Sequence, residues 1–168
     1  MPMQIRPEVP TDADAIARLT TAAFLAAPHA SQTEAFIVNA LRRAGQLTGS
    51  LVAQDGEALV GHVAVSPVTV SSGAAGWYGL GPVSVVPPRQ GQGIGAQLVR
   101  AALDALRRQG AAGCVVLGEP AYYGRFGFAA QPGLVLPGVP PQYFQALAFG
   151  GACPAGTVSY HDAFNATA

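Results

Sequence analysis

Three glycines stand at alternate positions in the segment "PPRQGQGIGAQLV", directly before a stretch with the periodicity of an amphipathic helix. Gly91, Gly93 and Gly95 leave the backbone without side chains, so several N–H groups can converge on one ligand. The first turn of the following helix adds unpaired N–H donors and the positive end of the helix dipole. This combination predicts an anion site with phosphate as its usual ligand, and Arg89 adds a positive charge at the rim.

Two common types of phosphate-binding loop, the P-loop and the dinucleotide-binding loop, do not match this segment well. A P-loop requires a lysine after its last glycine, and the segment has none. The string "GQGIGA" satisfies the dinucleotide-binding fingerprint, and Glu119 follows the next strand as a ribose ligand would. However, residues 87–90 separate the strand from the first glycine, and the chain offers a single βαβ unit. A dinucleotide site is therefore the weaker alternative.

The longer segment "VSVVPPRQGQGIGAQLV" is similar to the acetyl-CoA motif of the GNAT family of N-acetyltransferases. The family pattern Gln/Arg-x-x-Gly-x-Gly/Ala is met by Gln90, Gly93 and Gly95. A later segment, "YYGRFGF", resembles the family's Tyr-x-x-x-Gly-Phe element, with Tyr123 as its tyrosine. The resemblance covers most of residues 3–130, and the run "VLGEPAYYGRFGF" is most similar to the bacterial YhbS-type acetyltransferases.

The resemblance implies how acetyl-CoA is bound. The pyrophosphate would lie on backbone N–H groups of the glycine loop, and the pantetheine arm would pair with the preceding strand. A backbone N–H such as that of Val85 would stabilise the tetrahedral intermediate of acyl transfer. The loop positions are Gln90, Gly91, Gln92, Gly93, Ile94, Gly95 and Ala96, and the strand positions are Val83, Ser84 and Val85.

The resemblance also implies that Tyr123 donates a proton to the departing CoA thiolate. A thiol of pKa about 8.5 and a phenol of pKa about 10 are close enough for proton transfer in a tight site. The alternative role for Tyr123 is packing against its neighbour Tyr122. Family members often carry an asparagine seven residues before this tyrosine, whereas this chain has Val116, which leaves the detailed placement of Tyr123 open.

The base that deprotonates the acceptor amine is the least determined part of the site. Glu119 is the first candidate because it ends a strand beside the cofactor, although it also suits the cap of a short helix. Glu34 faces the family's usual acceptor side but fits a capping box with Ser31. His62 is interpreted as a half-buried strand histidine. An amine of low pKa needs no base, and no metal-ligand spacing occurs in the chain.

The elements that must position these groups follow from the sequence pattern. Strands are predicted at 3–9, 50–70 (two strands joined at Asp55-Gly56), 76–86, 113–118, 133–137 and 156–161. Helices are predicted at 11–24, starting with a Thr11–Asp14 capping pair, at 31–45, and at about 92–109, with a short helix or turn at 119–128. The buried face of the helix at 92–109 consists of Ile94, Leu98, Ala102 and Leu106.

This order predicts an α/β fold with a GNAT-type mixed central sheet, antiparallel in its first half, with flanking helices. Glycines and Pro82 in the strand at 76–86 predict a splayed central strand pair around 79–82. We expect a single domain over 1–168, with a core at about 3–130 and C-terminal strands at about 131–168. Those strands would complete the chain's own sheet or meet a second subunit in a homodimer; both remain open.

The composition narrows the function. Half of the 168 residues are hydrophobic, 11% are charged, and the formal net charge is zero, which argues against a nucleic-acid partner. No apolar run is long enough to cross a membrane, and no secretory signal is apparent, so we expect a cytoplasmic protein. Two cysteines form no disulfide framework.

These expectations combine into one function. The chain is expected to transfer an acetyl group from acetyl-CoA, its cosubstrate, to a primary amine of a small molecule. Two enzymatic variants are a longer acyl-CoA donor or a hydroxyl acceptor. A non-catalytic acyl-CoA sensor is the alternative from another functional class.

Overall fold

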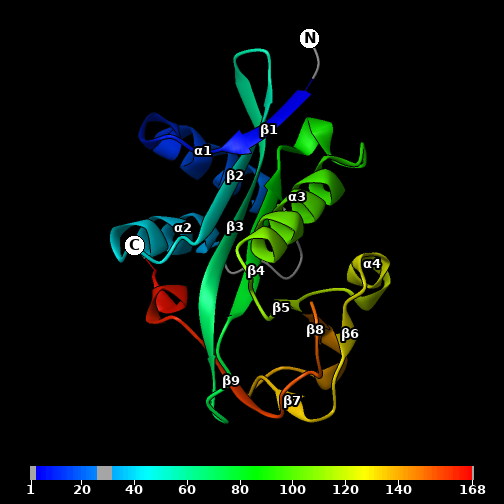
Figure 1. Ribbon diagram of the computed structural model, residues 1–168. Helices are drawn as coiled ribbons and strands as arrows, with labels where there is room; N and C mark the ends of the chain where they lie inside the picture. Colours follow the sequence, from blue (N-terminus) through cyan, green and yellow to red (C-terminus); the bar gives the residue numbers. More distant parts are fainter. Residues whose placement is uncertain (1–2, 26–31, 168) are drawn as a thin grey trace. The chain divides into compact units, whose positions relative to one another are not determined.

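The computed structural model describes residues 3–25 and 32–167 (Figure 1). The chain divides into two compact units. The first unit comprises residues 1–65, 81–102 and 162–168, and the second comprises residues 66–80 and 103–161. Strands β3 (Ala58–Val70) and β4 (Trp77–Val85) and helix α3 (Ile94–Arg108) run through both. None of the helices in the described part of the chain is long and apolar enough to cross a bilayer.

The first unit is built on antiparallel strands. Strand β1 (Met3–Pro7) pairs with β2 (Gly49–Asp55), and β2 pairs with β3. The predicted turn between β2 and β3 is confirmed: Asp55 pairs with Ala58, and Gly56 has a φ of +63°. That left-handed conformation is easy only for glycine, so the dipeptide fixes the register of the hairpin.

Helices cover both faces of these strands. Val52 of β2 packs with Ile16 of α1 (Ala13–Phe24) and Val38 of α2 (Glu34–Arg43). Gly61 pairs with Ala53, so it faces the opposite side, where the side chain of Leu98 on α3 lies against it. Helices α1 and α2 therefore lie on one face of β2–β3, and α3 lies on the other (Figure 1).

The second unit combines parallel and antiparallel pairing. The start of β4 pairs in parallel with β5 (Gly113–Leu117), which pairs antiparallel with β8 (Phe144–Ala148), and β8 pairs with β6 (Ala129–Ala130). The end of β3 pairs with β9 (Gly156–Tyr160), which pairs with β7 (Leu134–Val135). Its core contains Val68, Val70, Trp77, Val115, Leu134, Phe144, Ala146 and Val158.

The predicted mixed α/β fold is confirmed, with differences in detail. The helix predicted at 92–109 spans 94–108, and its four predicted core residues are all buried. The segments at 133–137 and 156–161 contain β7 and β9, which pair within this chain. Strands β6 and β8 were missed. The segment "FQALA" of β8 has no alternation of apolar and polar residues, and its strand conformation follows from pairing with β5.

The start of α1 also differs from the prediction. Residues 10–12 form a short 3₁₀ turn, and the residue preceding α1 is Asp12 rather than Thr11. The Asp12 carboxylate accepts hydrogen bonds from the backbone N–H of Val9 and from the Arg6 guanidinium, both at 2.8 Å. An ion pair therefore fixes the corner between β1 and α1 in place of the Thr11–Asp14 capping pair. The other predicted cap, Ser31, lies outside the described residues.

Candidate acetyl-CoA site

The glycine loop follows β4 and leads into the first turn of α3 in the first unit. Gly91 and Gly93 have φ values of +78° and +84°, and space is open beside both, with no atom within 4 Å of a Cβ built there. The carbonyl of Gly93 accepts the first helical hydrogen bond, from Gln97 N–H at 3.1 Å. Within the described residues, the backbone N–H groups of 91–96 have no acceptor. These donors and the dipole of α3 can hold an anion.

The polar side chains of the loop hold its backbone. The Gln90 amide donates to the carbonyl of Val85 at 2.9 Å and so closes the turn between β4 and the glycines. Arg89 donates from Nε to Gln92 Oε1 at 3.0 Å and from Nη1 to Asp55 Oδ2 at 2.8 Å. The charge predicted for the rim is therefore paired with Asp55, which the sequence identified only as a turn residue.

Among the described residues, only the start of the strand before the loop pairs with β5. The parallel ladder between β4 and β5 joins Trp77–Gly79 to Gly113–Val115, although β4 continues to Val85. The ladder ends where the splay around 79–82 was predicted, and the peptide bond between Gly81 and Pro82 is cis. Ser84 is buried, and its hydroxyl has no hydrogen-bond partner in the described part of the chain. The splayed strand can donate to and accept from an extended ligand.

Tyr123 lies at the end of α4 (Pro120–Tyr123) in the second unit, within an aromatic cluster. Its ring lies edge-to-face with Tyr122 at 5.0 Å and with Phe128 at 6.1 Å between centroids. A Cβ at Gly118 would collide with this ring, so the glycine permits its position. Burial, together with the neighbouring Tyr122, raises the pKa of Tyr123 to about 12, which keeps the phenol protonated at neutral pH.

The three candidates for a base lie in different surroundings. Glu119 precedes α4 with an exposed side chain that makes no capping hydrogen bond, while its backbone carbonyl accepts from Tyr123 N–H at 3.0 Å. Glu34 is the first residue of α2. His62 is completely buried rather than half-buried as predicted, and burial lowers its pKa to about 4. A histidine shielded from solvent in this way is a poor proton acceptor for an external amine.

Comparison with known proteins decides the family. The chain matches the acetyltransferase (GNAT) family over residues 13–128. It belongs to the GNAT family. It is 44% identical over 127 residues to the uncharacterized N-acetyltransferase YhbS of Escherichia coli, which covers 75% of this chain and 73% of that protein.

Solved structures support the same assignment for this GNAT chain. A GNAT family acetyltransferase from Brucella melitensis, in complex with acetyl-CoA, matches with a TM-score of 0.87 and 50% identity over 97% of this chain and 98% of that one. YhbS from E. coli, in complex with CoA, matches with a TM-score of 0.87 and 39% identity over 97% and 92%. The resemblance predicted from the two motifs is thereby confirmed.

The glycine loop of this GNAT protein was predicted from the sequence, but the ion pair that joins Arg89 to Asp55 was not. Asp55, which pairs with Arg89, lies in a hairpin turn 34 residues away, so no local signal connects the two. In the described part of the chain, no three histidine, cysteine, aspartate or glutamate residues form a group that could hold a metal ion.

Proposed function

We propose that this chain binds acetyl-CoA through the glycine loop and transfers the acetyl group to a primary amine of a small molecule, with its two units acting as one transferase domain. The observation that carries the proposal is the row of N–H groups at 91–96, at the start of α3, for which the described residues provide no acceptor. The acetyl-CoA and CoA complexes of the Brucella and E. coli proteins support it. When bound, acetyl-CoA supplies a thioester that an amine attacks with release of the CoA thiol.

The residues before α3 bind and orient in this proposal. The amides of 91–96 hold the diphosphate, and the open space beside Gly91 and Gly93 allows it to approach the backbone. Val83, Ser84 and Val85 pair with the extended arm of the cosubstrate. Gln90 keeps the loop closed through the carbonyl of Val85, so its side chain acts on the loop conformation rather than on the phosphate.

Tyr123 is assigned the role of proton donor to the leaving thiolate. Its raised pKa of about 12 keeps the phenol protonated until a thiolate forms, but it also makes the phenol a weaker acid, so the transfer requires a site that raises the pKa of the CoA thiol as well. Glu119 is assigned the role of base, since its carboxylate is exposed and makes no capping hydrogen bond. The assignment of Tyr123 rests on its match to the family motif and on its buried surroundings, whereas that of Glu119 rests on its position between β5 and α4 and on its exposed side chain.

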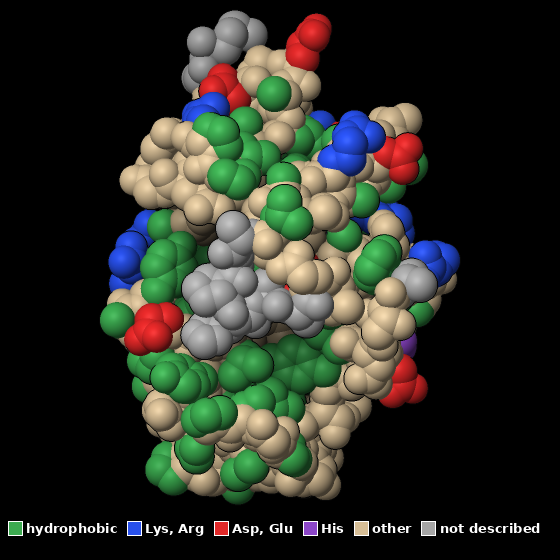
Figure 2. Space-filling model, turned by 180° about the vertical axis from the view of Figure 1, so that it is seen from behind, with side chains coloured by type: hydrophobic (Ala, Val, Ile, Leu, Met, Phe, Trp, Pro, Cys, Tyr) green, Lys and Arg blue, Asp and Glu red, His purple; other side chains and the backbone are tan. Residues whose placement is uncertain are grey.

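The acceptor is proposed to be small because the surface offers little to attract a charged polymer. Figure 2 shows one face on which charged side chains are few and scattered among hydrophobic and uncharged polar groups. With nine basic and nine acidic residues, the chain has no excess charge with which to attract nucleic acid.

The test is a screen of small primary amines with acetyl-CoA, followed by thiol release and by mass spectrometry of the product. The sequence contains no lysine, so autoacetylation of lysine cannot add to the signal. Cys153 is partly exposed, and the variant Cys153→Ser removes its reaction with the thiol reagent. Acetyl-CoA, unlike NADH, should raise the melting temperature. If acetyl-CoA binds and no amine is acetylated, transfer to a small primary amine is contradicted, and a sensor, a longer acyl-CoA donor or a hydroxyl acceptor takes its place.

A matched pair of glycine variants tests the loop. Gly93 and Gly73 both have positive φ (+84° and +89°), and an added Cβ meets no atom within 4 Å at either position. Alanine costs about 1–2 kcal/mol in this conformation, so Gly93→Ala should weaken acetyl-CoA binding by about tenfold. Gly73→Ala introduces the same strain in the turn before β4 and should leave binding unchanged. Equal binding by both variants would contradict the assignment of the loop.

A further inference from the structure

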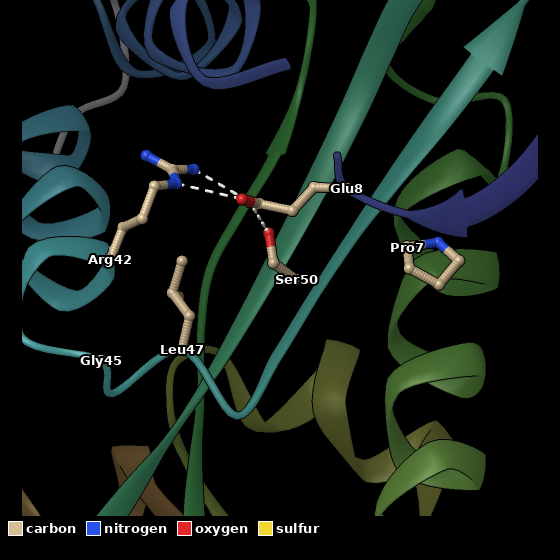
Figure 3. A pocket seen from close by; sticks show the side chains of 6 residues that line it. All are labelled: Pro7, Glu8, Arg42, Gly45, Leu47 and Ser50. Carbon is tan, nitrogen blue, oxygen red and sulfur yellow. Dashed lines mark hydrogen bonds and ion pairs between the residues drawn. The ribbon is translucent and has the colours of Figure 1, made fainter. Parts of the chain in front are cut away.

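A cavity of about 390 Å³ lies in the first unit, formed by residues outside the glycine loop and β4 (Figure 3). It is bounded by the last residue of β1 and the residue after it, by the last turn of α2 and the loop after it, and by the start of β2. Its volume falls in the lower part of the range typical of small-molecule sites. The lining residues are Pro7, Glu8, Arg42, Gly45, Leu47 and Ser50.

Local backbone structure builds the walls of the cavity. Helix α2 ends in a Schellman motif, in which Gly45 with φ +70° donates to Arg42 O at 3.2 Å and Gln46 N–H donates to Leu41 O at 2.9 Å. This reversal places Arg42 and Leu47 at the same cavity. On the other side, Glu8 N–H donates to Ser50 O at 2.9 Å and joins the end of β1 to the start of β2.

A carboxylate and a guanidinium form the polar centre of the cavity. Arg42 donates from Nε to Glu8 Oε2 at 3.0 Å and from Nη2 to Glu8 Oε1 at 2.9 Å, and the Ser50 hydroxyl also donates to Glu8 Oε1 (Figure 3). Burial alone would raise the pKa of Glu8, but these hydrogen bonds and the charge of Arg42 outweigh it, so the pKa lies below its ordinary value. Glu8 is therefore ionised and the pair is neutral overall.

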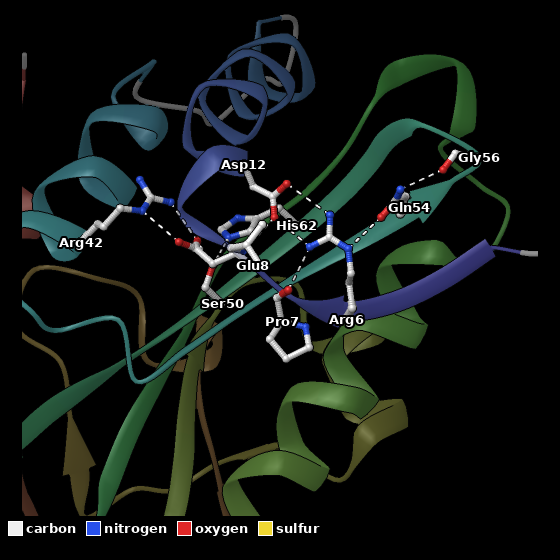
Figure 4. A network of polar contacts seen from close by, with 10 residues as sticks. Arg6, Pro7, Glu8, Asp12, Arg42, Ser50, Gln54, Gly56 and His62 are labelled. Atoms are coloured by element: carbon white, nitrogen blue, oxygen red, sulfur yellow. Dashed lines mark hydrogen bonds and ion pairs between the residues drawn. The ribbon is translucent and has the colours of Figure 1, made fainter.

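Ser50 connects this pair to a buried histidine (Figure 4). Its Oγ lies 2.7 Å from His62 Nε2. Since the serine proton is directed to the ionised Glu8, Nε2 must donate the hydrogen bond, which assigns the tautomer of His62. The buried His62 therefore donates a hydrogen bond to the Ser50 hydroxyl, which in turn donates to the carboxylate of Glu8 and orients it.

The hydrogen-bonding capacity left in the pair defines a ligand. Arg42 has five N–H groups, of which Glu8 takes two and Asn39 takes one at 3.0 Å from Nη1; among the described residues, one N–H on each terminal nitrogen has no acceptor. Glu8 has about four acceptor positions, and the described residues use three of them, which leaves one on Oε2. The open positions thus comprise one donor on each terminal nitrogen of Arg42, which suits a carboxylate, and one acceptor on Glu8, which suits an ammonium group.

From this arrangement we infer that the cavity binds a free α-amino acid with an apolar side chain. Its carboxylate would receive the terminal N–H groups of Arg42, its ammonium group would donate to Glu8, and its side chain would contact Pro7 and Leu47. Charge favours the zwitterion over simpler ions, because a lone carboxylate or a lone amine would leave one unbalanced charge beside a neutral ion pair. The site is separate from the proposed acetyl-CoA loop in its residues and in its ligand.

The experiment measures by calorimetry the affinity of the unmodified protein for three ligands of similar shape, in the absence of acetyl-CoA. The ligands are L-leucine, L-leucinamide, which lacks the carboxylate, and 4-methylpentanoic acid, which lacks the ammonium group. L-Leucine should bind at least about tenfold more tightly than either analogue. Equal affinities for the three, or no saturable binding of leucine, would overturn the inference. Because acetyl-CoA is absent, either result leaves the test of acetyl transfer independent.

Two variants locate the site. Arg42→Lys keeps the positive charge and loses the planar fork, and it should lower the affinity for leucine by about tenfold. Arg43→Ala changes the neighbouring exposed arginine, which does not line the cavity, and should leave the affinity unchanged. Equal affinity in Arg42→Lys and the unmodified protein would overturn the site.

Discussion

The Arg89 guanidinium lies 2.8 Å from the Asp55 carboxylate, so the residue before the glycine loop is joined to the tip of the β2–β3 hairpin. The same guanidinium donates to Gln92 at 3.0 Å, within the loop itself. Asp55 therefore acts on the loop through Arg89, and the positive charge next to the proposed phosphate site is compensated before any ligand arrives. Binding of an anion then depends on the orientation of backbone amides more than on a free side-chain charge.

We predict that Asp55→Ala weakens acetyl-CoA binding by about twofold to fivefold, because the released Arg89 no longer holds Gln92 and the loop loses order. The pair is partly exposed, which keeps the effect modest. Calorimetry on Asp55→Ala, Arg89→Ala and the double variant measures the coupling. The double variant should bind about as weakly as either single variant. Tighter binding by Asp55→Ala would mean that the charge of Arg89, once freed, matters more than its position.

Tyr123→Phe should lower kcat by about a hundredfold or more while leaving the affinity for acetyl-CoA unchanged, as expected for the loss of a general acid. The matched control is Tyr122→Phe, which keeps the aromatic contact with Tyr123 and the ring beneath the Arg125 guanidinium at 4.6 Å. Since the pKa of Tyr123 is about 12, its ionisation should add no loss of activity with rising pH below about pH 10. Normal turnover by Tyr123→Phe would remove the residue from the mechanism.

The loop and its helix were predictable because their signals are local. Alternate glycines and a four-residue apolar period specify α3 within one segment, and the shift of its start to Ile94 follows from the positive φ of Gly93. The pairing of Arg89 with Asp55 was not predictable, since it depends on where the β2–β3 hairpin brings its tip.

The parts of the fold that were missed depend on partners far away in the sequence. Strand β8 is apolar except for Gln145, which is buried. The amide of Gln145 donates to the carbonyl of Gly118 at 3.2 Å, and this hydrogen bond makes its burial tolerable. Likewise, Asp12 replaces Thr11 before α1 because Arg6 on β1 provides an ion-pair partner. Local propensity could not reveal either contact.

Gly61→Ala should destabilise the first unit by about 1–3 kcal/mol, as overpacking of a well-filled contact does. A Cβ there would lie 2.9 Å from a methyl of Leu98 and 3.2 Å from the carbonyl of Ser84, so the buried Leu98 side chain would have to shift and the contact with Ser84 would tighten. Urea unfolding measures the loss. Gly124→Ala is the control, because a Cβ at that position meets nothing within 4 Å and its φ of −57° suits alanine. Equal stability of the two variants would contradict the close contact at Gly61.

His62 should make the protein lose stability as the pH falls from about 6.5 to about 4. Burial lowers the pKa of His62 to about 4, with Glu8 and Arg42 acting on it in opposite directions, so the unfolded chain binds a proton in this window that the folded chain does not. The contribution is complete above pH 6.5 and decreases by roughly 3 kcal/mol by pH 4. Urea unfolding of His62→Gln at pH 7, 5.5 and 4.5 should show a shallower decline in stability than that of the unmodified protein. Parallel declines in the two proteins would show that the acid sensitivity arises from other groups.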